Sequence, residues 1–562
     1  MKSTGAQLIV QLLERQGVRI VPGIPGGANL PLYDALSRSL AIRHVLARHE
    51  QGAGFIAQGM ARVTGAPAVF LATSGPGATN ALTALADAKL DSVPLVCITG
   101  QVATPLIGTD AFQEVDTYGM SIPVTKHNFL VRSAGELLEV VPEAFRIAAS
   151  GRPGPVLIDV PKDVQTQTVE FEAWPSPGAP DAPPAVASGA LERAARLVGA
   201  ARSPILYLGG GVARPDAAAA AARFAERASI PVALSLMALG ALPWDHPLNL
   251  GLLGMHGARH ANLALEECDL LIVAGARLDD RATGKVSEFC PRARVLHVDI
   301  DESEIGKLRP VQAGIVADAG EVLRRLLPKI RHRRRQEWLG RIEELRGAFP
   351  PHFPGIEDPT SPYGAVRRAA ELLGPDAIVA TDVGQHQMRT AQAFPFTRPR
   401  QWLTSGGLGT MGFGLPAALG AWLAEPQRPV LCVSGDGSLL MNVQELATVA
   451  EEGADLKLLL MNNRSLGLVH QQQDLFYGGR IFASRFRVDV DFPGLARSLG
   501  WKAIDLGAAP EPSEALARAL STAGPVLVNV PVDVEEKVYP MVPPGAANRE
   551  MIGGENDVRA CG

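Results

Sequence analysis

The stretch from Val430 to Leu468 constrains the fold of this chain more strongly than any other. It contains an apolar run (VLCVSG), a helical segment (MNVQELATVAEEG) and a second apolar run (LKLLLMNN). This succession predicts a right-handed βαβ unit whose two strands are parallel neighbours. Asn442 and Glu445 have the spacing of a capping box, which predicts where the intervening helix begins.

Two polar side chains follow the predicted strands of this unit. Asp436 comes directly after the first strand and Asn463 after the second (463 − 436 = 27 positions). Because the carboxyl ends of parallel strands meet at one edge of a sheet, these side chains are expected to lie together. With the backbone carbonyl of Ser465 as a third ligand they suit Mg²⁺, which prefers oxygen and keeps sites for water and phosphate. Gly435 and Gly437 would let a diphosphate approach the backbone. The chain has no G-x-x-x-x-G-K-[ST] motif, so that phosphate would be held through the metal.

The length of 562 residues predicts about three or four domains, and two proline-rich stretches divide the chain. These stretches predict domains at 1–173, 190–346 and 363–545, linkers at 174–189 and 347–362, and a tail at 546–562. Residues 154–164 (GPVLIDVPKDV) and 524–534 (GPVLVNVPVDV) are identical at eight of eleven positions. The first and third domains are therefore predicted to be copies of one α/β fold. A chance likeness of two buried strands is the alternative.

The charge pattern and the hydropathy exclude several classes of protein. The formal net charge is −5, and the one basic cluster, Arg331–Arg335, is expected to be a solvated helix end and not a nucleic-acid site. No apolar run approaches the roughly 20 residues of a membrane span, and no signal peptide precedes the first predicted helix, so we expect a cytoplasmic protein. The cysteines show no CxxC pairing and are expected to be reduced, structural thiols: Cys97, Cys268, Cys290, Cys432 and Cys561.

The first domain opens with a helix that Thr4 and Gln7 are predicted to cap. Further on, Glu50 marks the start of a predicted helix (Gln51–Arg62) directly after a predicted strand (His44–Ala47). A carboxylate in this place has an ordinary explanation, a favourable interaction with the helix dipole. Its setting, ARHEQGAGFIAQGMAR, also pairs it with a helix of small residues against which something large can pack.

A lone GDG is most often a plain turn, but GDG, a helix and NN after the next strand together resemble the thiamine diphosphate (ThDP) motif. Further segments extend the likeness over essentially the whole chain: IPGGANLPLYDAL, RHEQGAGFIAQGMAR, SGPGATN, GTDAFQEVD, RPGPVLIDVPKDV, TDVGQHQM, GGLGTMGFGLPAA, GDGSLLMN and MNN. They resemble the catalytic subunits of the acetohydroxyacid synthase (acetolactate synthase) family, most of all the bacterial isozyme I type. The resemblance implies an α/β fold of three Rossmann-like, doubly wound parallel-sheet domains. The first would bind the pyrimidine of ThDP, the middle one FAD, and the third the diphosphate.

The resemblance also implies a reaction and a catalytic set. Members of this family are transferases that use ThDP and Mg²⁺ to decarboxylate pyruvate. They condense the remaining two-carbon group with a second 2-keto acid, pyruvate or 2-ketobutyrate, in valine, leucine and isoleucine biosynthesis. Glu50 matches the residue that bonds the aminopyrimidine N1′, and Arg281 matches the residue that holds the acceptor carboxylate. An ion pair at the surface or beside FAD is the alternative for Arg281. Gln113 and Gly27 match positions that border the reacting centre, and Lys126 is included in the catalytic set.

The cofactor residues that the resemblance implies form three groups. ThDP would contact Glu50, Gln385, His386, Gly409, Met411, Gly437 and Ser438, and the metal would contact Asp436, Asn463 and Ser465. FAD would contact Arg152, Gly210, Gly211, Leu253, Gly254, Met255, His256, Gly275, Arg277, Asp279, Asp299 and Asp318. Residues 407–412 formally match G-x-G-x-x-G, but no sizeable strand precedes them, so we reject a dinucleotide site there. Apart from the family, Met411 reads as an ordinary core methionine and Gly210–Gly211 as a plain turn.

The family further implies a homodimer or homotetramer, in which Glu50 of one chain meets Asp436 of another at the dimer interface, and a small regulatory subunit. Arg389 and Gln472 depart from the family, because many members carry Trp at these positions. Without that aromatic wall we expect a weak preference between pyruvate and 2-ketobutyrate as acceptor. The alternative functions are another ThDP-dependent 2-keto acid decarboxylase or carboligase, and a non-catalytic FAD-binding homologue. The chain has no adjacent His-His pair of the decarboxylase kind.

Overall fold

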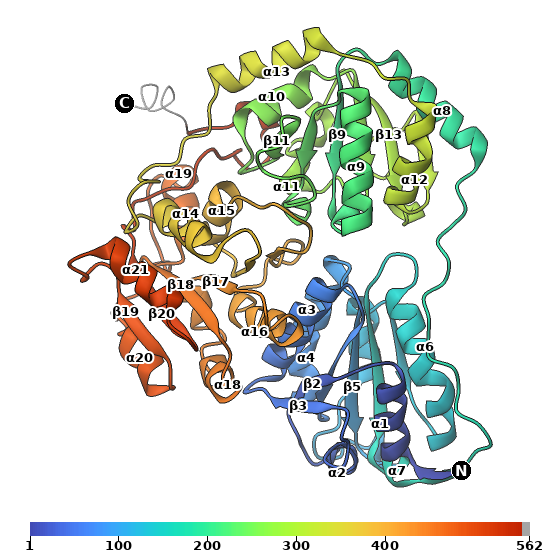
Figure 1. Ribbon diagram of the computed structural model, residues 1–562. Coiled ribbons are helices and arrows are strands. Elements are labelled where there is room, and N and C mark those ends of the chain that lie inside the picture. The colour runs from blue at the N-terminus through green and yellow to red at the C-terminus, as the bar shows by residue number, and fades with distance from the viewer. Residues whose placement is uncertain (554–562) are drawn as a thin grey trace.

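The computed structural model describes residues 1–553 and contains three six-stranded parallel sheets, each flanked by helices (Figure 1). We call them the first, middle and third units, in chain order. In Figure 1 the middle unit lies at the top, the first unit at the lower right and the third unit at the left. Three parallel α/β sheets confirm the predicted fold class.

The first unit has the strand order β3-β2-β4-β5-β7-β6. Its helix α1 begins with the predicted capping box, because the Thr4 hydroxyl accepts from the Gln7 backbone and the Gln7 side chain accepts from the Thr4 backbone. The strands are β2 (Ile20–Gly23), β3 (Arg43–Leu46), β4 (Ala68–Ala72), β5 (Leu95–Gln101), β6 (His127–Leu130) and β7 (Pro155–Pro161). The main helices are α1 (Gly5–Arg15), α2 (Leu30–Leu36), α3 (Glu50–Thr64), α4 (Pro76–Leu90) and α6 (Leu137–Ala149).

The third unit repeats this topology. Its strand order is β16-β15-β17-β18-β20-β19, so both sheets read 2-1-3-4-6-5 when strands are numbered within the unit. The two copies of the repeated motif form the corresponding strands β7 and β20, which confirms the predicted duplication. The strands are β15 (Ile378–Thr381), β16 (Trp402–Leu403), β17 (Val430–Gly435), β18 (Leu456–Asn462), β19 (Lys502–Asp505) and β20 (Val526–Pro531). The main helices are α14 (Pro362–Leu373), α15 (Gln385–Ala393), α16 (Gly414–Ala424), α17 (Asp436–Leu439), α18 (Glu445–Glu451), α19 (Gly467–Phe476), α20 (Phe492–Ser498) and α21 (Pro512–Ser521).

The middle unit has a different order, β11-β10-β9-β12-β13-β14, which reads 3-2-1-4-5-6 within the unit. This is the dinucleotide-binding order, whose direction reverses between the first and fourth strands, here β9 and β12. The strands are β9 (Pro204–Leu208), β10 (Val232–Leu234), β11 (Asn249–Leu252), β12 (Leu270–Ala274), β13 (Arg294–Asp299) and β14 (Ala313–Val316). The main helices are α8 (Ser188–Ala200), α9 (Pro215–Ala228), α10 (Arg259–Glu267), α12 (Ala319–Leu326) and α13 (Gln336–Ala348).

The first and third units share an apolar core. Strands β5 and β17 are buried along their whole length, as expected for parallel strands covered on both faces. Between the two sheets, Ile56 and Phe70 of the first unit and Leu419 of the third belong to one cluster of buried side chains. Each such side chain contributes about 1.5–3 kcal/mol by its burial, so apolar contact stabilises the junction of the two units.

One local prediction is wrong, and a second holds for four of the five residues concerned. Asn442 and Glu445 do not form a capping box: α18 begins at Glu445, and the Asn442 amide donates to the Gly412 carbonyl instead (2.7 Å). Nor is the basic cluster Arg331–Arg335 wholly solvated. Arg335 is 5% exposed and its guanidinium donates to the Val198 carbonyl near the end of α8 (2.8 Å). In both cases a partner distant in sequence replaces the local one.

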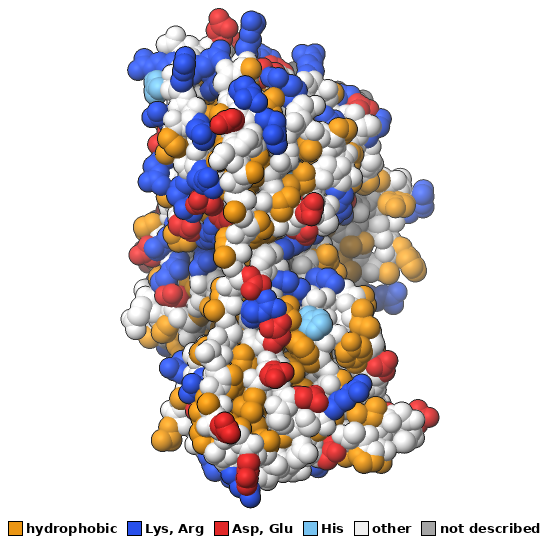
Figure 2. Space-filling view, turned by 90° about the vertical axis from the view of Figure 1, so that its right-hand side faces the viewer, with side chains coloured by type: hydrophobic (Ala, Val, Ile, Leu, Met, Phe, Trp, Pro, Cys, Tyr) orange, Lys and Arg blue, Asp and Glu red, His pale blue; other side chains and the backbone are white. Residues whose placement is uncertain are grey.

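The chain returns from the third unit to the middle unit after β20. The Val542 backbone N–H donates to the Met255 carbonyl (2.8 Å), and the Asn548 side chain donates to the Ala282 carbonyl (2.9 Å). The last part of the predicted tail, with Cys561, lies outside the described residues, whereas Cys97, Cys268, Cys290 and Cys432 are buried free thiols. No helix within residues 1–553 is long and apolar enough to cross a membrane. Figure 2 shows basic, acidic and apolar side chains interspersed on one face, with more basic ones toward its upper part.

Candidate active site

A cavity of about 180 Å³ lies at the carboxyl edge of the third sheet, where the parallel neighbours β17 and β18 end. The predicted metal ligands Asp436, Asn463 and Ser465 all line it. Its lining also includes every third-unit residue predicted to contact ThDP: Gln385, His386, Gly409, Met411, Gly437 and Ser438. The topology therefore brings together residues from five separate segments of the chain.

Asp436 and Asn463 face this cavity from neighbouring strand ends. Asp436 is 2% exposed, and burial raises the pKa of its carboxyl to about 6 against the opposing effect of nearby backbone N–H groups. The Asn463 Oδ1 accepts from the Ser465 backbone N–H (3.1 Å), and the Asn463 Nδ2 donates to Gln385 Oε1 (3.3 Å). Within residues 1–553 no group of three or more His, Cys, Asp or Glu side chains could hold a metal. A cation here would therefore draw on one carboxylate together with amide, carbonyl and ligand oxygens, which suits Mg²⁺ with a diphosphate.

His386 lines the cavity as a neutral imidazole. Burial lowers its pKa to about 3, and its Nε2 atom has no hydrogen-bond partner in the part of the chain that the structure describes. A Cβ atom on Gly384 would lie 2.7 Å from the imidazole ring, and one on Gly435 would lie 2.8 Å from it. The two glycines therefore make room for the ring, whose unpaired nitrogen indicates a ligand of this cavity.

Asp382 holds the loop that carries Met411. This carboxylate directly follows β15 and is completely buried. Its Oδ1 accepts from the backbone N–H groups of Gly412 (2.8 Å) and Gly414 (2.9 Å), and its Oδ2 accepts from the Ser434 hydroxyl (2.6 Å). Burial raises the pKa of Asp382, whereas these hydrogen bonds favour its charged form. Gly412 has a φ of +91°, which a glycine adopts without strain.

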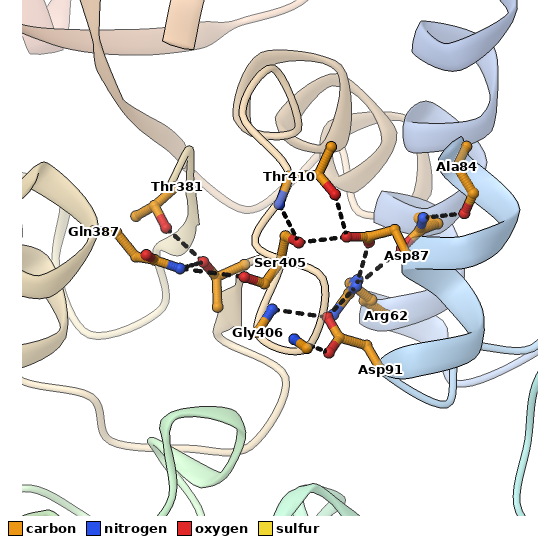
Figure 3. A network of polar contacts seen from close by, with 12 residues as sticks. Arg62, Ala84, Asp87, Asp91, Thr381, Gln387, Ser405, Gly406 and Thr410 are labelled. Atoms are coloured by element: carbon orange, nitrogen blue, oxygen red, sulfur yellow. Dashed lines mark hydrogen bonds and ion pairs between the residues drawn. The ribbon is translucent and has the colours of Figure 1, made fainter. Parts of the chain in front are cut away.

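A buried polar network in the first unit holds the other end of this loop (Figure 3). Arg62, on α3, donates to Asp87 (3.2 Å) and to Asp91 (2.8 Å), on and directly after α4. Both carboxylate side chains are fully buried, and the Arg62 side chain is 8% exposed. One arginine thus compensates two carboxylates that apolar surroundings would otherwise leave unpaired.

The same two carboxylates also bind residues 405–410 of the loop that carries Met411. Asp91 accepts from the backbone N–H groups of residues 406 (3.0 Å) and 407 (2.7 Å). Asp87 accepts from the hydroxyl of Thr410 (3.0 Å) and from the hydroxyl of Ser405. Since Gly409 and Met411 of this loop line the cavity, the first unit sets the position of one cavity wall.

Glu50 lies at the carboxyl edge of the first sheet. It begins α3 after β3 and is 8% exposed, and its Oε2 accepts from the Asn80 side chain (3.0 Å). Burial and the nearby charge of Glu50 raise the pKa of Tyr33. A Cβ atom on Gly77 would lie 3.2 Å from the Glu50 Oε1, so the glycine leaves space around this carboxylate.

Two other predicted catalytic residues belong to this edge, and one does not. Gly27 follows β2, and Gln113 packs against Gly75 at the start of α4, 2.9 Å from where a Gly75 Cβ would lie. Lys126 instead precedes β6 and donates from its Nζ to carbonyl groups near the end of α6, such as that of Ile147 (2.5 Å). Because the strands are parallel, Lys126 lies at the opposite edge of the sheet from Glu50 within one chain, and its catalytic role stays a prediction.

Most residues predicted to contact FAD gather at the carboxyl edge of the middle sheet. A Cβ atom on Gly211 would lie 2.8 Å from the Gly275 Cα, so the loops after β9 and β12 touch through glycine backbone. The reversal of strand order places a dinucleotide crevice between these two strands. The predicted residues follow or end β9, β11, β12, β13 and β14: Gly210, Gly211, Leu253, Gly254, Met255, His256, Gly275, Arg277, Asp279, Asp299 and Asp318.

Arg152 of the predicted FAD set and Arg281 of the predicted catalytic set have different neighbours. Arg152 reaches from the first unit to the middle one, where its Nη1 pairs with Asp301 (3.1 Å) and Glu304 (2.9 Å). Arg281 is exposed: its Nη1 lies 3.3 Å from the Met255 sulfur and its Nε lies 3.9 Å from an Asp280 carboxylate oxygen. Arg152 therefore joins two units, whereas Arg281 keeps donors available to a ligand at the surface.

Known proteins match this chain over nearly its full length. Family models of thiamine pyrophosphate enzymes match in order: the N-terminal TPP binding domain at residues 3–120, the central domain at 191–326 and the C-terminal TPP binding domain at 382–530. The chain is 57% identical to the acetolactate synthase isozyme 1 large subunit of Escherichia coli (strain K12), over 98% of each protein. The chain belongs to the acetolactate synthase large-subunit family. The same family includes the acetolactate synthase large subunit of Corynebacterium glutamicum, 46% identical over 98% of this chain and 90% of that protein. Another member is the isozyme 2 large subunit of Escherichia coli (strain K12), 46% identical over 98% of this chain and 99% of that protein.

The range that matches the C-terminal TPP binding domain contains the residues predicted to bind the diphosphate. The same range contains every residue that lines the cavity except Val532. The lining fits the diphosphate end of ThDP: His386 offers an unpaired nitrogen, and Gly435 and Gly437 expose backbone. No lining residue comes from the first unit, so Glu50 lies outside the cavity of its own chain.

Several polar residues at the candidate site were not predicted from the sequence. Asp382 follows a strand directly, as Asp436 does, and this placement was a usable signal. Asn80 closes the motif SGPGATN, but nothing local indicates that its amide meets Glu50. Asp87 and Asp91 contact partners more than 300 positions away, so no sequence pattern reveals them.

Proposed function

We propose that this chain is the catalytic subunit of a ThDP- and Mg²⁺-dependent acetolactate synthase, a transferase. It would decarboxylate pyruvate and join the two-carbon group to pyruvate or 2-ketobutyrate in valine, leucine and isoleucine biosynthesis. One observation carries the proposal: Asp436, Asn463 and Ser465 line a single cavity together with all the third-unit ThDP candidates. Full-length relatives named acetolactate synthase large subunits support it.

Residues of the third unit would bind and place the cofactor. ThDP, when bound, supplies a carbanion that can add to the carbonyl of a 2-keto acid. Asp436 and Asn463, with the Ser465 carbonyl, would hold Mg²⁺ and through it the diphosphate. The Nε2 atom of His386 would face the diphosphate, to which it can donate a hydrogen bond when that nitrogen carries a proton. Met411, on the loop anchored by first-unit carboxylates, would support the body of the cofactor.

Glu50 would hold a proton between its carboxyl group and the aminopyrimidine N1′. A carboxyl group with little exposure to water suits this role, because low dielectric strengthens its hydrogen bond to the pyrimidine. The Asn80 amide keeps the Oε2 atom of Glu50 in place (3.0 Å). Since Glu50 is absent from the lining of its own chain's cavity, a homodimer or homotetramer would supply it from a second subunit.

We extend the proposal to the middle unit and to partners. FAD would bind at the carboxyl edge of the middle sheet, across the loops after β9 and β12. Arg281 would hold the acceptor carboxylate in a bidentate fashion, and Gly27 and Gln113 would border the reacting centre. A small regulatory subunit and a cytoplasmic location complete the proposal, with domains at 1–173, 190–346 and 363–545.

The acceptor preference follows from α19, which carries Gln472. Without an aromatic wall, the extra methylene of 2-ketobutyrate gains little, and a methylene in an apolar pocket is worth only about 1–3 kcal/mol. Pyruvate and 2-ketobutyrate offered together should therefore yield both products in comparable amounts. Overwhelming formation of acetohydroxybutyrate would contradict this expectation.

The proposal is tested by product analysis from pyruvate, with and without ThDP and Mg²⁺. We expect acetolactate only when both are present, and acetaldehyde as the sole product would indicate a decarboxylase. Glu50→Gln should reduce turnover by about 10²–10⁴-fold, the usual contribution of a proton-transferring group, while bound flavin is retained. Glu514→Gln, which alters a 72% exposed carboxylate on α21, is the matched control. Equal turnover in the two variants would overturn the assignment of Glu50.

A further inference from the structure

An ion pair with one buried partner lies at the cavity wall: Arg389 lines the cavity, whereas the Glu536 side chain is 45% exposed. Arg389, on α15, is 2% exposed, and its Nη2 lies 3.2 Å from the Oε2 of Glu536. The Arg389 guanidinium also lies over the ring of Tyr363, 5.8 Å from the ring centre. Glu536 belongs to the segment that follows β20, and Val532 of that segment lines the cavity. The pair therefore fixes this segment beside the cavity wall.

The backbone of the same residue orients a cavity side chain. The Gln385 Nε2 donates to the Glu536 carbonyl (3.0 Å) and to the Gln471 Oε1 (3.0 Å). Gln471 in turn exchanges two hydrogen bonds with the backbone of Val538 (2.9 and 3.0 Å). Because both N–H groups of the Gln385 amide are engaged on this side, its Oε1 must point the other way.

The orientation of Gln385 sets the orientation of Asn463. The Gln385 Oε1 accepts from the Asn463 Nδ2 (3.3 Å), which turns the Asn463 Oδ1 away from Gln385. That oxygen is the proposed metal ligand, and it already accepts from the Ser465 backbone N–H (3.1 Å). If the Asn463 amide were reversed, its NH₂ group would face the cation, which accepts only oxygen ligands of this kind.

We propose that the Arg389–Glu536 ion pair is a positioning device for the metal site, acting through the Gln385 amide on Asn463. The inference rests on the proposed function, because it assumes that Asn463 binds Mg²⁺. Arg389 does not touch the metal in this scheme and is a positioning residue. Groups that orient metal ligands typically change metal affinity by 10–100-fold. Arg389 acts one step further out, so we expect an effect of roughly threefold to tenfold.

The test measures Mg²⁺ binding by isothermal titration calorimetry on the full chain, freed of metal and saturated with ThDP. Arg389→Met should weaken Mg²⁺ binding by about threefold to tenfold, and Glu536→Gln should act in the same direction. Arg518→Met removes an exposed ion pair with Glu514 in the same unit and should leave Mg²⁺ binding unchanged. Normal Mg²⁺ binding by folded Arg389→Met would overturn the inference. Absence of Mg²⁺ binding in the parent chain would instead overturn the proposed function.

Measuring Arg389→Met in the Asn463→Asp background distinguishes the positioning of residue 463 from a general structural effect of Arg389. In Asn463→Asp both terminal atoms of the side chain are oxygens, so the orientation of residue 463 no longer matters. Arg389→Met should therefore change Mg²⁺ affinity less than about twofold in this background, a non-additivity typical of residues in one network. An equal loss of affinity in both backgrounds would show that Arg389 acts through the fold or through direct contact with the bound cofactor, and would overturn the inference.

Discussion

Two glycines let the first and third units touch where helices α3 and α16 cross. A Cβ atom on Gly59 would lie 2.1 Å from the Ala417 carbonyl oxygen, and one on Gly420 would lie 1.9 Å from the Ile56 carbonyl oxygen. Contacts this short do not occur with real Cβ atoms, so the helices would have to separate by about 1 Å. Gly59→Ala is therefore expected to disturb the interface between the two units.

The expected change in the free energy of unfolding of Gly59→Ala is the difference between two opposing effects. In an exposed helix interior, Gly→Ala stabilises by about 0.5–1 kcal/mol, because the unfolded chain loses freedom. Overpacking of a rigid core costs about 1–3 kcal/mol and sometimes more. At Gly59 the obstacle is backbone, which cannot rotate away, so the cost exceeds the gain. We expect a net loss of roughly 1–2 kcal/mol in the free energy of unfolding.

The matched control is Gly340→Ala, in α13. This glycine is exposed, and a Cβ atom there would meet nothing within 4 Å. Urea unfolding followed by circular dichroism compares the two variants at their first cooperative transition, since a chain of three units need not unfold in one step. Gly59→Ala should lower the urea midpoint, and Gly340→Ala should leave it unchanged or raise it. A Gly59→Ala midpoint equal to or above that of the parent would show that the helices are not limited by this contact.

Two further predictions concern buried charges. Arg62→Met should destabilise the fold by about 3–5 kcal/mol in urea unfolding, because two buried carboxylates lose their cation; a loss below about 1 kcal/mol would contradict the role given to this network. Burial raises the pKa of Asp159 to about 7 in the folded chain, whereas it is about 4 in the unfolded chain. The folded state therefore disfavours ionisation of this carboxyl group, and the free energy of unfolding decreases as the pH rises from about 4 to about 7. Urea midpoints measured between pH 4 and pH 7 should therefore fall less steeply with pH in Asp159→Asn than in the parent. Identical slopes would refute the raised pKa of Asp159.

Patterns that repeat along the chain predicted most of the architecture. The motif shared by residues 154–164 and 524–534 falls on the corresponding strands β7 and β20, because buried parallel strands keep an apolar sequence that is easily compared. The joint position of Asp436 and Asn463 also followed from the sequence, since both directly succeed adjacent parallel strands.

Side-chain partners distant in sequence account for what the patterns missed. Asn442 has the spacing of a cap, yet its amide meets the Gly412 carbonyl, an interaction created only when the loop folds back. Arg335 belongs to a basic run, but its guanidinium donates to carbonyl groups near the ends of two helices instead of to water. Lys126 shows the same limit for position, because its sequence motif does not indicate that it lies at the amino end of β6, with its Nζ on the Ile147 carbonyl.

The cation site can be observed directly in crystals grown with ThDP and Mn²⁺, an ion that takes oxygen ligands as Mg²⁺ does and scatters anomalously. We predict one anomalous peak within about 2.3 Å of both an Asp436 carboxylate oxygen and the Asn463 Oδ1, with a diphosphate oxygen beside it. A peak elsewhere in the chain, or a bound ThDP whose diphosphate lies away from these two side chains, would contradict the proposed site.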